Sequence, residues 1–408
     1  MIQMSALSYR SRQAKNPIEE EDRVADMLAR QGKKVIKLNR GDPAVYFKTP
    51  DYVIDAYKRA LDSGKTHYTD PVGVPELRQA VADRYKRLYG LETNAGKVIV
   101  TQGVSEALLM LNFTLINRGD KGILFRPYYP IYIPYLRIFG GGTVMERYAE
   151  GNCWNVDTDS LERSLKKHAK SKRVKYMMIT NPNNPTGTVL SRSTLEEVVN
   201  LANEYDLLLI SDEIYDELVF NKAKFTSICQ VAQGISYAIL NGASKNFDAT
   251  GFRLGFILMP GEHKNSEAIR EALKRYATMR LSANAPGQYA LAEAMNNEKE
   301  HKKAIGAMVK ELESRVNFTT KRVNESRFMH AVVPKGAFYI FPRVDFSRLA
   351  LRNDRTFVDE LLREEQVQIT RGSGFGDEGH VRIVSLAPKE ILESAINRID
   401  SFCRRHER

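Results

Sequence analysis

Short, almost continuous apolar runs alternate with longer amphipathic stretches between about residues 97 and 260. The apolar runs, rich in Val, Ile, Leu and Met, span residues 98–101, 122–125, 176–180, 207–211, 238–241 and 255–259. Strands buried on both faces have this composition, which is typical of a mostly parallel sheet covered by helices. Stretches between them, such as 105–116 and 193–205, have helical periodicity. We therefore predict an α/β fold here.

The pattern changes after about Ala290. A long charged stretch with helical periodicity runs to about Asn324, and strand-like runs follow at 337–341 and 380–386. Helices are predicted at 354–365, between these two runs, and at 390–403. This mixture is typical of a smaller α+β domain.

Near the N-terminus we expect one amphipathic helix at 19–31 and one strand at 35–38. We therefore divide the chain into three parts. They are an N-terminal arm that includes part of the small domain (1–45), a large domain (46–290) and a small C-terminal domain (291–408).

Composition is ordinary for a globular protein, with 43% hydrophobic and 27% charged residues among 408. The net charge is +11, but the densest basic run, 163–175, has a helical pattern typical of a solvated helix end, and no nucleic-acid-binding motif is present. Three scattered cysteines suit neither a disulfide framework nor a zinc site, and we expect no metal. With no signal peptide or membrane span in the pattern, we expect a cytoplasmic protein.

The segment 244–253 places a lysine directly after a predicted buried strand and an arginine eight residues later. Burial at the end of a rigid element would lower the pKa of Lys245, so that its neutral amine could attack a carbonyl. The planar guanidinium of Arg253 suits a phosphate. Taken alone, however, a lysine at a strand end is more often a plain surface lysine.

Three other segments also follow predicted strands. Residues 181–187 contain two prolines and a glycine, a rigid turn that could present the amide of Asn184 at a fixed point. Asp212 ends an apolar strand, where α/β proteins bind ligands and where an unpaired carboxylate is costly. At 102–107 a helix begins, and its first N–H groups form an anion site. The alternatives are a structural turn for 181–187 and a helix N-cap for Asp212.

Together, these segments resemble the class I/II aminotransferases of the pyridoxal phosphate (PLP) fold type I, the group related to aspartate aminotransferase. The likeness runs from 38–43 through His67, Tyr68 and 127–130 to 380–384. The C-terminal third is most similar to the bacterial-type alanine aminotransferases, on the segments 279–286, 336–342 and 380–386. The resemblance implies a large domain with a mostly parallel seven-stranded sheet between helices, plus a smaller α+β domain.

The resemblance also implies a role for each matching residue around the cofactor. Lys245 would hold PLP as a Schiff base, and Asp212 would keep the pyridine nitrogen protonated. Asn184 and Tyr215 would hydrogen-bond the phenolic oxygen of the ring, and Tyr129 would stack on its face.

The phosphate would be held by the backbone of Val104 and Ser105 together with Arg253. Tyr68 would reach the phosphate of the neighbouring subunit, which implies a homodimer with shared active sites.

Arg382 would bind the substrate α-carboxylate, with Asn184 and the backbone of Gly41 nearby. The amine of Lys245, displaced by the substrate, would act as the general base at Cα. The implied reaction is a ping-pong transfer of an amino group from alanine or glutamate to pyruvate or 2-oxoglutarate.

Four residues depart from the pattern or lack a role in it. Gly242 stands where many relatives carry a phosphate-binding serine, and Ser244 could compensate or point away, so we leave it out of the site. Arg40 replaces a small or apolar residue, and we favour a surface charge over a position near the entrance. Arg280 could bind a second carboxylate or could be a surface arginine at a helix end.

Two alternatives to the alanine-type reaction stay open, and a third is disfavoured. The substrate could be aspartate or an aromatic amino acid. The same fold and the same lysine also serve PLP-dependent carbon–sulfur lyases. A non-enzymatic sensor domain of a transcriptional regulator is disfavoured, because only about forty residues precede the predicted PLP domain and they contain no helix-turn-helix pattern.

Overall fold

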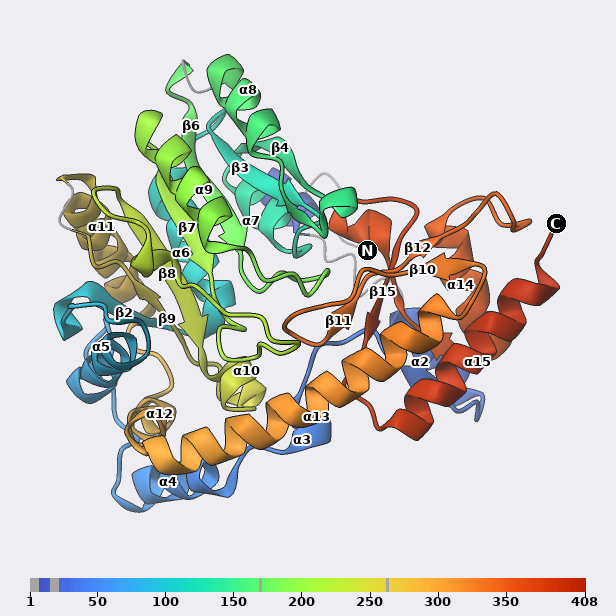
Figure 1. Cartoon of the computed structure of the whole chain (residues 1–408). Helices are drawn as coiled ribbons and strands as arrows, with labels where there is room; N and C mark the ends of the chain where they lie inside the picture. The colour runs from blue at the N-terminus through green and yellow to red at the C-terminus, as the bar shows by residue number, and fades with distance from the viewer. Residues whose placement is uncertain (1–6, 15–21, 169–170, 262–263) are drawn as a thin grey trace.

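The computed structural model describes residues 7–14, 22–168, 171–261 and 264–408. A large sheet with helices on both faces forms one part of the molecule, and a smaller part made of the C-terminal residues and an N-terminal segment lies beside it (Figure 1). This confirms the predicted α/β fold with a smaller α+β unit.

The large sheet has the strand order β2-β9-β8-β7-β6-β3-β4-β5. Its strands are β2 (Val98–Thr101), β3 (Lys121–Arg126), β4 (Gly142–Ala149), β5 (Asn155–Val156), β6 (Val174–Thr180), β7 (Leu208–Asp212), β8 (Tyr237–Gly242) and β9 (Gly255–Leu258). The strands from β8 through β7, β6 and β3 to β4 are parallel, whereas β9 runs antiparallel to both of its neighbours. The seven-stranded expectation is therefore met, and the two-residue strand β5 extends the sheet by one antiparallel edge.

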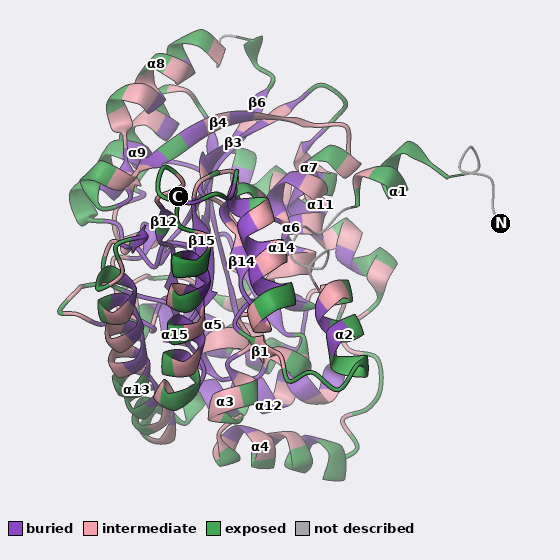
Figure 2. Ribbon diagram, turned by 90° about the vertical axis from the view of Figure 1, so that its right-hand side faces the viewer, coloured by how far each residue is buried: buried purple, intermediate pink, exposed green. Residues whose placement is uncertain are grey.

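Consecutive residues of the central strands belong to two different hydrophobic cores. Met177 and Ile179 of β6 pack into one core, whereas Tyr176 and Met178 pack into the other. The first core is covered by α5 (Pro75–Tyr89), α8 (Thr158–His168), α9 (Arg192–Glu204) and α12 (Ala285–Asn296). The second is covered by α6 (Gly103–Leu115), α7 (Tyr132–Ile138) and α11 (Lys264–Arg280). Both faces of the sheet are therefore buried beneath helices, which explains the continuous apolar runs (Figure 2).

Strand β4 was missed by the sequence pattern. Its buried positions include Glu146, 6% exposed, so that a polar residue stands where the pattern requires an apolar one. The side chain of Glu146 lies 3.5 Å from the hydroxyl of Ser160, which provides a polar neighbour.

The smaller part has its own core, built on a three-stranded antiparallel sheet of β11 (Tyr339–Ile340), β15 (Val381–Val384) and β14 (Thr370–Arg371). Its other elements are β10 (Met329–His330), β12 (Arg343–Val344), β13 (Val367–Gln368), α13 (Glu298–Asn324), α14 (Asp354–Glu365) and α15 (Lys389–Arg405). The predicted helices at 354–365 and 390–403 correspond to α14 and α15.

Two helical predictions need correction. The charged stretch from about 290 to 324 is not one helix, because α12 ends at Asn296 and Asn297 caps the start of α13 with its side chain. In the basic run 163–175, the helix α8 ends at His168 and β6 begins at Val174.

The N-terminal segment joins the smaller part, as expected. Helix α2 (Asp22–Arg30) packs Ala25 and Leu28 against Leu362 of α14, and β1 (Ile36–Lys37) pairs in parallel with β13. The predicted helix was to begin at 19, and residues 19–21 lie outside the described residues. After β1 the chain leads into the space between the two parts, and this brings residues 39–42 to the site described next.

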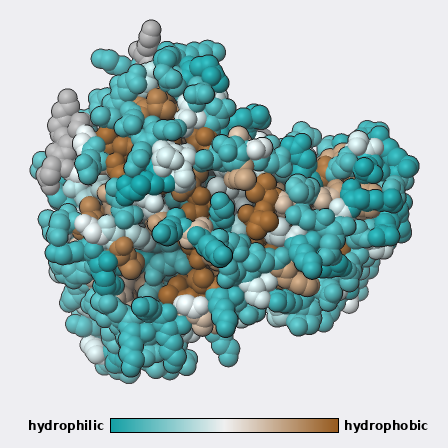
Figure 3. Space-filling view, viewed as in Figure 1, coloured by the Kyte–Doolittle hydropathy of each residue, from teal (hydrophilic) through white to brown (hydrophobic). Residues whose placement is uncertain are grey.

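Hydrophilic side chains cover most of the face seen in Figure 3, with hydrophobic groups toward the middle of the molecule. Among the described residues, no helix has both the length and the apolar character needed to cross a membrane.

Candidate active site

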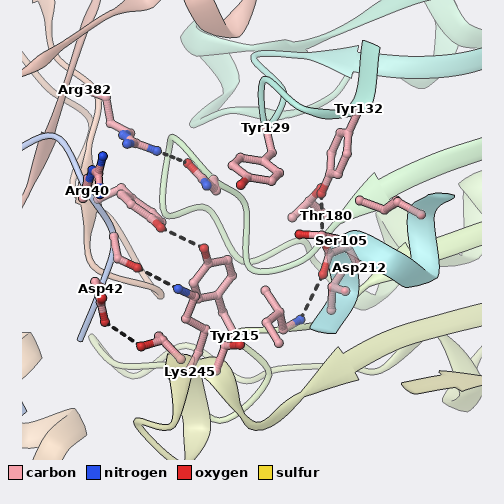
Figure 4. Close-up of a pocket in the computed structure, with 18 of the residues that line it drawn as sticks. Arg40, Asp42, Ser105, Tyr129, Tyr132, Thr180, Asp212, Tyr215, Lys245 and Arg382 are labelled. Atoms are coloured by element: carbon pink, nitrogen blue, oxygen red, sulfur yellow. Dashed lines mark hydrogen bonds between the residues drawn. The ribbon is translucent and has the colours of Figure 1, made fainter. Parts of the chain in front are cut away.

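A cavity of about 690 Å³ lies where the carboxyl ends of β6, β7 and β8 meet the start of α6 and the smaller part of the molecule. Ten of the eleven predicted site residues line it: Gly41, Val104, Ser105, Tyr129, Asn184, Asp212, Tyr215, Lys245, Arg253 and Arg382. The eleventh, Tyr68, lies outside the cavity of this chain and is 78% exposed. Figure 4 shows Arg40, Asp42 and Arg382 on one side of the cavity, Ser105, Tyr132 and Asp212 on the other, and Lys245 and Tyr215 between them.

Lys245 is positioned by the short helix α10 (Ala243–Asn246), which begins directly after β8. Its Nζ atom donates a 2.6 Å hydrogen bond to the backbone oxygen of Gly41. Burial, together with the nearby cations Arg253 and Arg382, lowers the pKa of Lys245 to about 8 against the opposing effect of Asp42. An appreciable fraction of this amine is therefore neutral near pH 8, as a nucleophile or base requires.

Asp212 is the last residue of β7, and its carboxylate is buried at the far side of the cavity. Oδ2 accepts a 2.7 Å hydrogen bond from the hydroxyl of Tyr132, which also lies 2.9 Å from Oγ1 of Thr180. Oδ1 accepts a bond from the backbone N–H of Ile214. Burial raises the pKa of Asp212 to about 6 although these donors lower it, so a cationic partner would favour its charged form.

The start of α6 forms the anion-binding end of the cavity. Val104 and Ser105 stand in the first turn, where backbone N–H groups lack partners within the helix. The guanidinium of Arg253 lies against Gly103, and a Cβ atom at Gly103 would stand 2.7 Å from its Nη2 atom. Glycine at position 103 therefore makes room for the arginine beside the helix start.

Tyr215 and Tyr339 join the two parts of the molecule across the cavity. Their hydroxyls are 2.8 Å apart, and both rings are buried. The hydroxyl of Tyr339 fills the place that a side chain at Gly41 would occupy, since a Cβ atom there would overlap it. Glycine is therefore required at position 41 by close packing.

Arg382 lies on β15 and is 2% exposed. Its Nη1 atom donates a 3.0 Å hydrogen bond to Oδ1 of Asn184, and Nη2 donates to the backbone oxygen of Asn39. The guanidinium also lies over the rings of Tyr339 and Phe375. These contacts fix a planar, permanently charged group in the cavity wall, an arrangement suited to a carboxylate.

The structure gives a reason for one departure from the family pattern. Gly242 pairs with Gly255 between β8 and β9, and a Cβ atom at Gly242 would lie 2.7 Å from the Cα atom of Gly255 and would overlap the backbone oxygen of Leu254. No side chain fits at position 242. Ser244, which the expected site omitted, lines the cavity.

The structure settles where the two uncertain arginines lie. Arg40 lines the cavity, although its side chain is 66% exposed. Arg280 does not line the cavity of this chain, and it is not a surface arginine either, since its side chain is 8% exposed. Its Nη2 atom donates to the backbone oxygens of Pro71 and Val100, and Nη1 lies 3.4 Å from a carboxylate oxygen of Glu106.

The sequence reasoning gave no role to eight further lining residues: Asn39, Asp42, Leu108, Tyr132, Thr180, Ile214, Thr250 and Tyr339. Tyr132 is three residues beyond Tyr129, and Tyr339 lies inside the segment 336–342 that carried the resemblance. Those two positions could have been found from their place in the motifs. Thr180 ends β6 as Asp212 ends β7, and only the pairing of these strands brings the two residues together.

The polar groups that line the cavity fit the cofactor that the resemblance implies. A buried carboxylate whose pKa is raised by burial suits a protonated ring nitrogen, and the start of α6 with Arg253 suits a phosphate. Lys245 stands between these two ends with a lowered pKa.

Residues 33–399 match the family model "Aminotransferase class I and II". The chain is 34% identical to aromatic-amino-acid aminotransferase 2 of Thermococcus litoralis, over 92% of this chain and 94% of the relative. It is 32% identical to the glutamate-pyruvate aminotransferase AlaA of Haemophilus influenzae, over 92% of each. The alanine aminotransferase structure from Pyrococcus furiosus superposes with a TM-score of 0.93 at 35% identity, covering 98% of this chain and 100% of that one.

These likenesses confirm the predicted family, including its resemblance to alanine aminotransferases, and with it the expected cofactor. The similar proteins are named for different amino acids, so they identify the reaction rather than its substrate. The chain belongs to the class I and II aminotransferases and is a pyridoxal-phosphate-dependent transaminase.

Proposed function

We propose that this transaminase moves an amino group between L-alanine or L-glutamate and the 2-oxo acids pyruvate or 2-oxoglutarate. The observation that carries the proposal is the buried Arg382, held by Asn184 and the backbone of Asn39 at the side of the cavity opposite Asp212. Likeness to proteins named as alanine and glutamate-pyruvate aminotransferases supports this substrate class. Aspartate and aromatic amino acids are the alternatives.

In this proposal, two separate groups of cavity residues bind the ring nitrogen and the phosphate of the cofactor. Asp212, oriented by Tyr132, holds the proton on the ring nitrogen, while Val104, Ser105 and Arg253 bind the phosphate. When bound, the cofactor supplies an electron sink for the charge left at Cα.

Asn184 and Tyr215 hydrogen-bond the phenolic oxygen, and Tyr129 covers the ring face. Tyr339, bonded to Tyr215 and packed on Gly41, keeps Tyr215 in place.

Arg382 and Lys245 act on the substrate. Arg382 binds the α-carboxylate bidentately and thereby fixes the direction of the Cα–H bond, with Asn184 and the backbone of Gly41 nearby. The Nζ atom of Lys245 takes the proton from Cα as a general base, and its pKa of about 8 suits this task near neutral pH.

A homodimer with shared active sites is part of the proposal. Tyr68, Met279 and Leu281 are exposed apolar side chains, 78%, 72% and 51% exposed. The bond from Arg280 to the backbone oxygen of Pro71 places their two segments next to each other. A second copy of the chain would cover this surface, and Tyr68 would reach the phosphate site of the partner subunit.

We also propose a cytoplasmic location. The three cysteines, Cys153, Cys229 and Cys403, are all free thiols, as a reducing compartment permits.

A panel of amino donors tests the reaction, with 2-oxoglutarate as acceptor and with wild type and Lys245→Ala compared. We expect alanine to be a preferred donor and the variant to retain cofactor poorly and be almost inactive. Lys58→Ala, which removes an exposed lysine that does not line the cavity, is the matched control. Full activity of Lys245→Ala would refute the role of Lys245, and a strong preference for aspartate or tyrosine over alanine would refute the substrate assignment.

A further inference from the structure

Four cationic side chains line the cavity: Arg40, Lys245, Arg253 and Arg382. Three of them have tasks in the proposed function, at the phosphate, at Cα and at the α-carboxylate. Arg40 has none, and it was expected to be a surface charge. Its place in the cavity wall therefore needs its own explanation.

The backbone fixes Arg40 at the substrate side of the cavity. The preceding residue, Asn39, accepts a hydrogen bond from Arg382 through its backbone oxygen, and the following residue, Gly41, accepts one from Lys245. Arg40 thus stands between the residues bonded to the two groups that act on the substrate. Figure 4 shows it on the same side as Arg382, opposite Asp212 and Ser105.

Asp22 holds the guanidinium at this position. Its Oδ2 atom lies 2.5 Å from Nη2 of Arg40, and its Oδ1 atom accepts bonds from the side chains of Asn39 and Gln368. Burial raises the pKa of Asp22, but the bonds from Arg40, Gln368 and Asn39 outweigh burial and leave it below its usual value. Asp22 is therefore a fixed anion that orients Arg40 from the side of α2.

We propose that Arg40 binds the second carboxylate of a dicarboxylic substrate, glutamate or 2-oxoglutarate, while Arg382 binds the α-carboxylate. The inference deepens the proposed function and rests on it for the position of the α-carboxylate. Alanine and pyruvate have no second carboxylate, so the Arg40–Asp22 pair stays intact when they bind.

The chemistry of the pair permits this exchange. A guanidinium binds carboxylates through a planar fork of N–H donors, and Arg40 already presents this fork to one carboxylate. An ion pair whose arginine is two-thirds exposed contributes little to stability, so a substrate carboxylate can compete for the guanidinium at small cost. The same site would thus accept alanine as well as glutamate, and pyruvate as well as 2-oxoglutarate.

Binding of two unreactive acids tests the inference. Glutarate and pentanoate have the same number of carbon atoms, but only glutarate carries a second carboxylate. Calorimetric titration of the holoenzyme would give their affinities for wild type and Arg40→Gln. We expect the ratio of glutarate to pentanoate affinity to fall by about tenfold or more in the variant, the effect of losing a charge-assisted hydrogen bond. The ratio of kcat/KM for 2-oxoglutarate to that for pyruvate should fall in parallel.

Arg23→Gln is the matched control, because Arg23 lies next to Asp22 on the same helix, is exposed and does not line the cavity. Its glutarate-to-pentanoate ratio should stay within about twofold of wild type, since only screened long-range charge is lost. An unchanged ratio in Arg40→Gln, an equal loss for both acids, or the same fall in Arg23→Gln would each overturn the inference.

The two proposals can fail separately. If the wild type does not use alanine but its glutarate affinity depends on Arg40, the proposed substrate is wrong and Arg40 keeps its role. If alanine and 2-oxoglutarate react well in Arg40→Gln and the glutarate ratio is unchanged, the proposed function stands and the role of Arg40 is wrong.

Discussion

The hydroxyl of Tyr132 donates a 2.7 Å hydrogen bond to Oδ2 of Asp212, inside a buried wall of the active site. Tyr132 comes from the start of α7 and Asp212 from the end of β7, so the contact joins two separate segments. The bond stabilises the carboxylate in its charged form, the form that binds a protonated ring nitrogen.

Tyr132→Phe should therefore weaken cofactor binding. Without the hydroxyl, the pKa of Asp212 rises further above its usual value, and more of the carboxyl is protonated near neutral pH. Loss of a hydrogen bond to a charged group costs about 1.5–3 kcal/mol, so the affinity of the apoenzyme for PLP should fall about tenfold or more. Fluorescence titration of the apoenzyme with PLP measures this affinity.

Tyr176→Phe is the control for Tyr132→Phe. The hydroxyl of Tyr176 is equally buried and donates a 3.0 Å bond to Asn112, but it does not line the cavity. Equal losses of PLP affinity in both variants would show that the effect is structural rather than exerted through Asp212.

Gly41→Ala should disrupt the contact between Tyr339 and Tyr215. The added methyl group would overlap the hydroxyl of Tyr339, which must move away from Tyr215. We expect kcat/KM to fall by about tenfold or more, as 1 Å displacements in active sites do.

The double variant with Tyr339→Phe provides the sharper measurement, because it removes the hydroxyl, the atom that the methyl group would overlap most, and leaves ring carbons of Phe338 and Tyr339 at 3.0 Å. The double variant should lose much less activity than the sum of the two single losses predicts. If the losses of kcat/KM in the two single variants simply add in the double variant, the methyl group at position 41 acts through a contact other than that with the Tyr339 hydroxyl.

Glu213, the neighbour of Asp212, gives a prediction about pH. Its side chain is fully buried, and burial raises its pKa from 4.5 to about 8. The folded chain therefore keeps a proton on Glu213 between about pH 5 and 8 that the unfolded chain releases. This contribution to stability is complete below pH 4.5 and is lost as the pH rises through 8, with a slope of up to about 1.4 kcal/mol per pH unit.

Glu213→Gln keeps the shape of the protonated acid and cannot titrate. The free energy of unfolding of its apoenzyme, measured in urea, should fall less steeply between pH 5 and 8 than that of wild type. Glu196→Gln, at an exposed position on α9, should follow the wild-type profile. If the profiles of wild type and Glu213→Gln are parallel, Glu213 is charged in the folded chain.

Mixed dimers test the role of Tyr68. Lys245→Ala leaves its own site without the base, and Tyr68→Ala weakens the phosphate site of the partner subunit in a shared-site dimer. A heterodimer of the two variants would then contain one intact site and one doubly defective site. Refolding the variants together should give more activity than the two homodimers contribute by themselves. Activity that never exceeds their sum would place Tyr68 outside the partner subunit's site.

The six apolar runs predicted strands at the correct places because both faces of each strand pack against helices. The pattern could not reveal that β9 runs antiparallel, since direction leaves no mark on the hydrophobic sequence of a strand buried on both faces. It also missed β4, where Glu146 occupies a buried position.

For the site, the motifs identified residues whose roles the resemblance assigned, and ten of these eleven line one cavity. The positions of Tyr132 and Tyr339 beside or inside the motifs mark them as candidates, but their contacts with Asp212 and Tyr215 exist only after folding. For Arg40 the two alternatives were not exclusive, because a side chain can be mostly exposed and still form part of a cavity wall.

The close contact between Gly242 and Gly255 limits how the site can be engineered. A Cβ atom at Gly255 would in turn lie 2.7 Å from the carbonyl carbon of Gly103 at the start of α6. Three segments distant in sequence thus touch backbone to backbone. Grafting the serine of other family members onto position 242 would wedge these segments apart rather than add a phosphate ligand. For redesign, a side chain at Gly242 requires the backbone at Leu254 and Gly255 to move, and one at Gly255 requires the start of α6 to move.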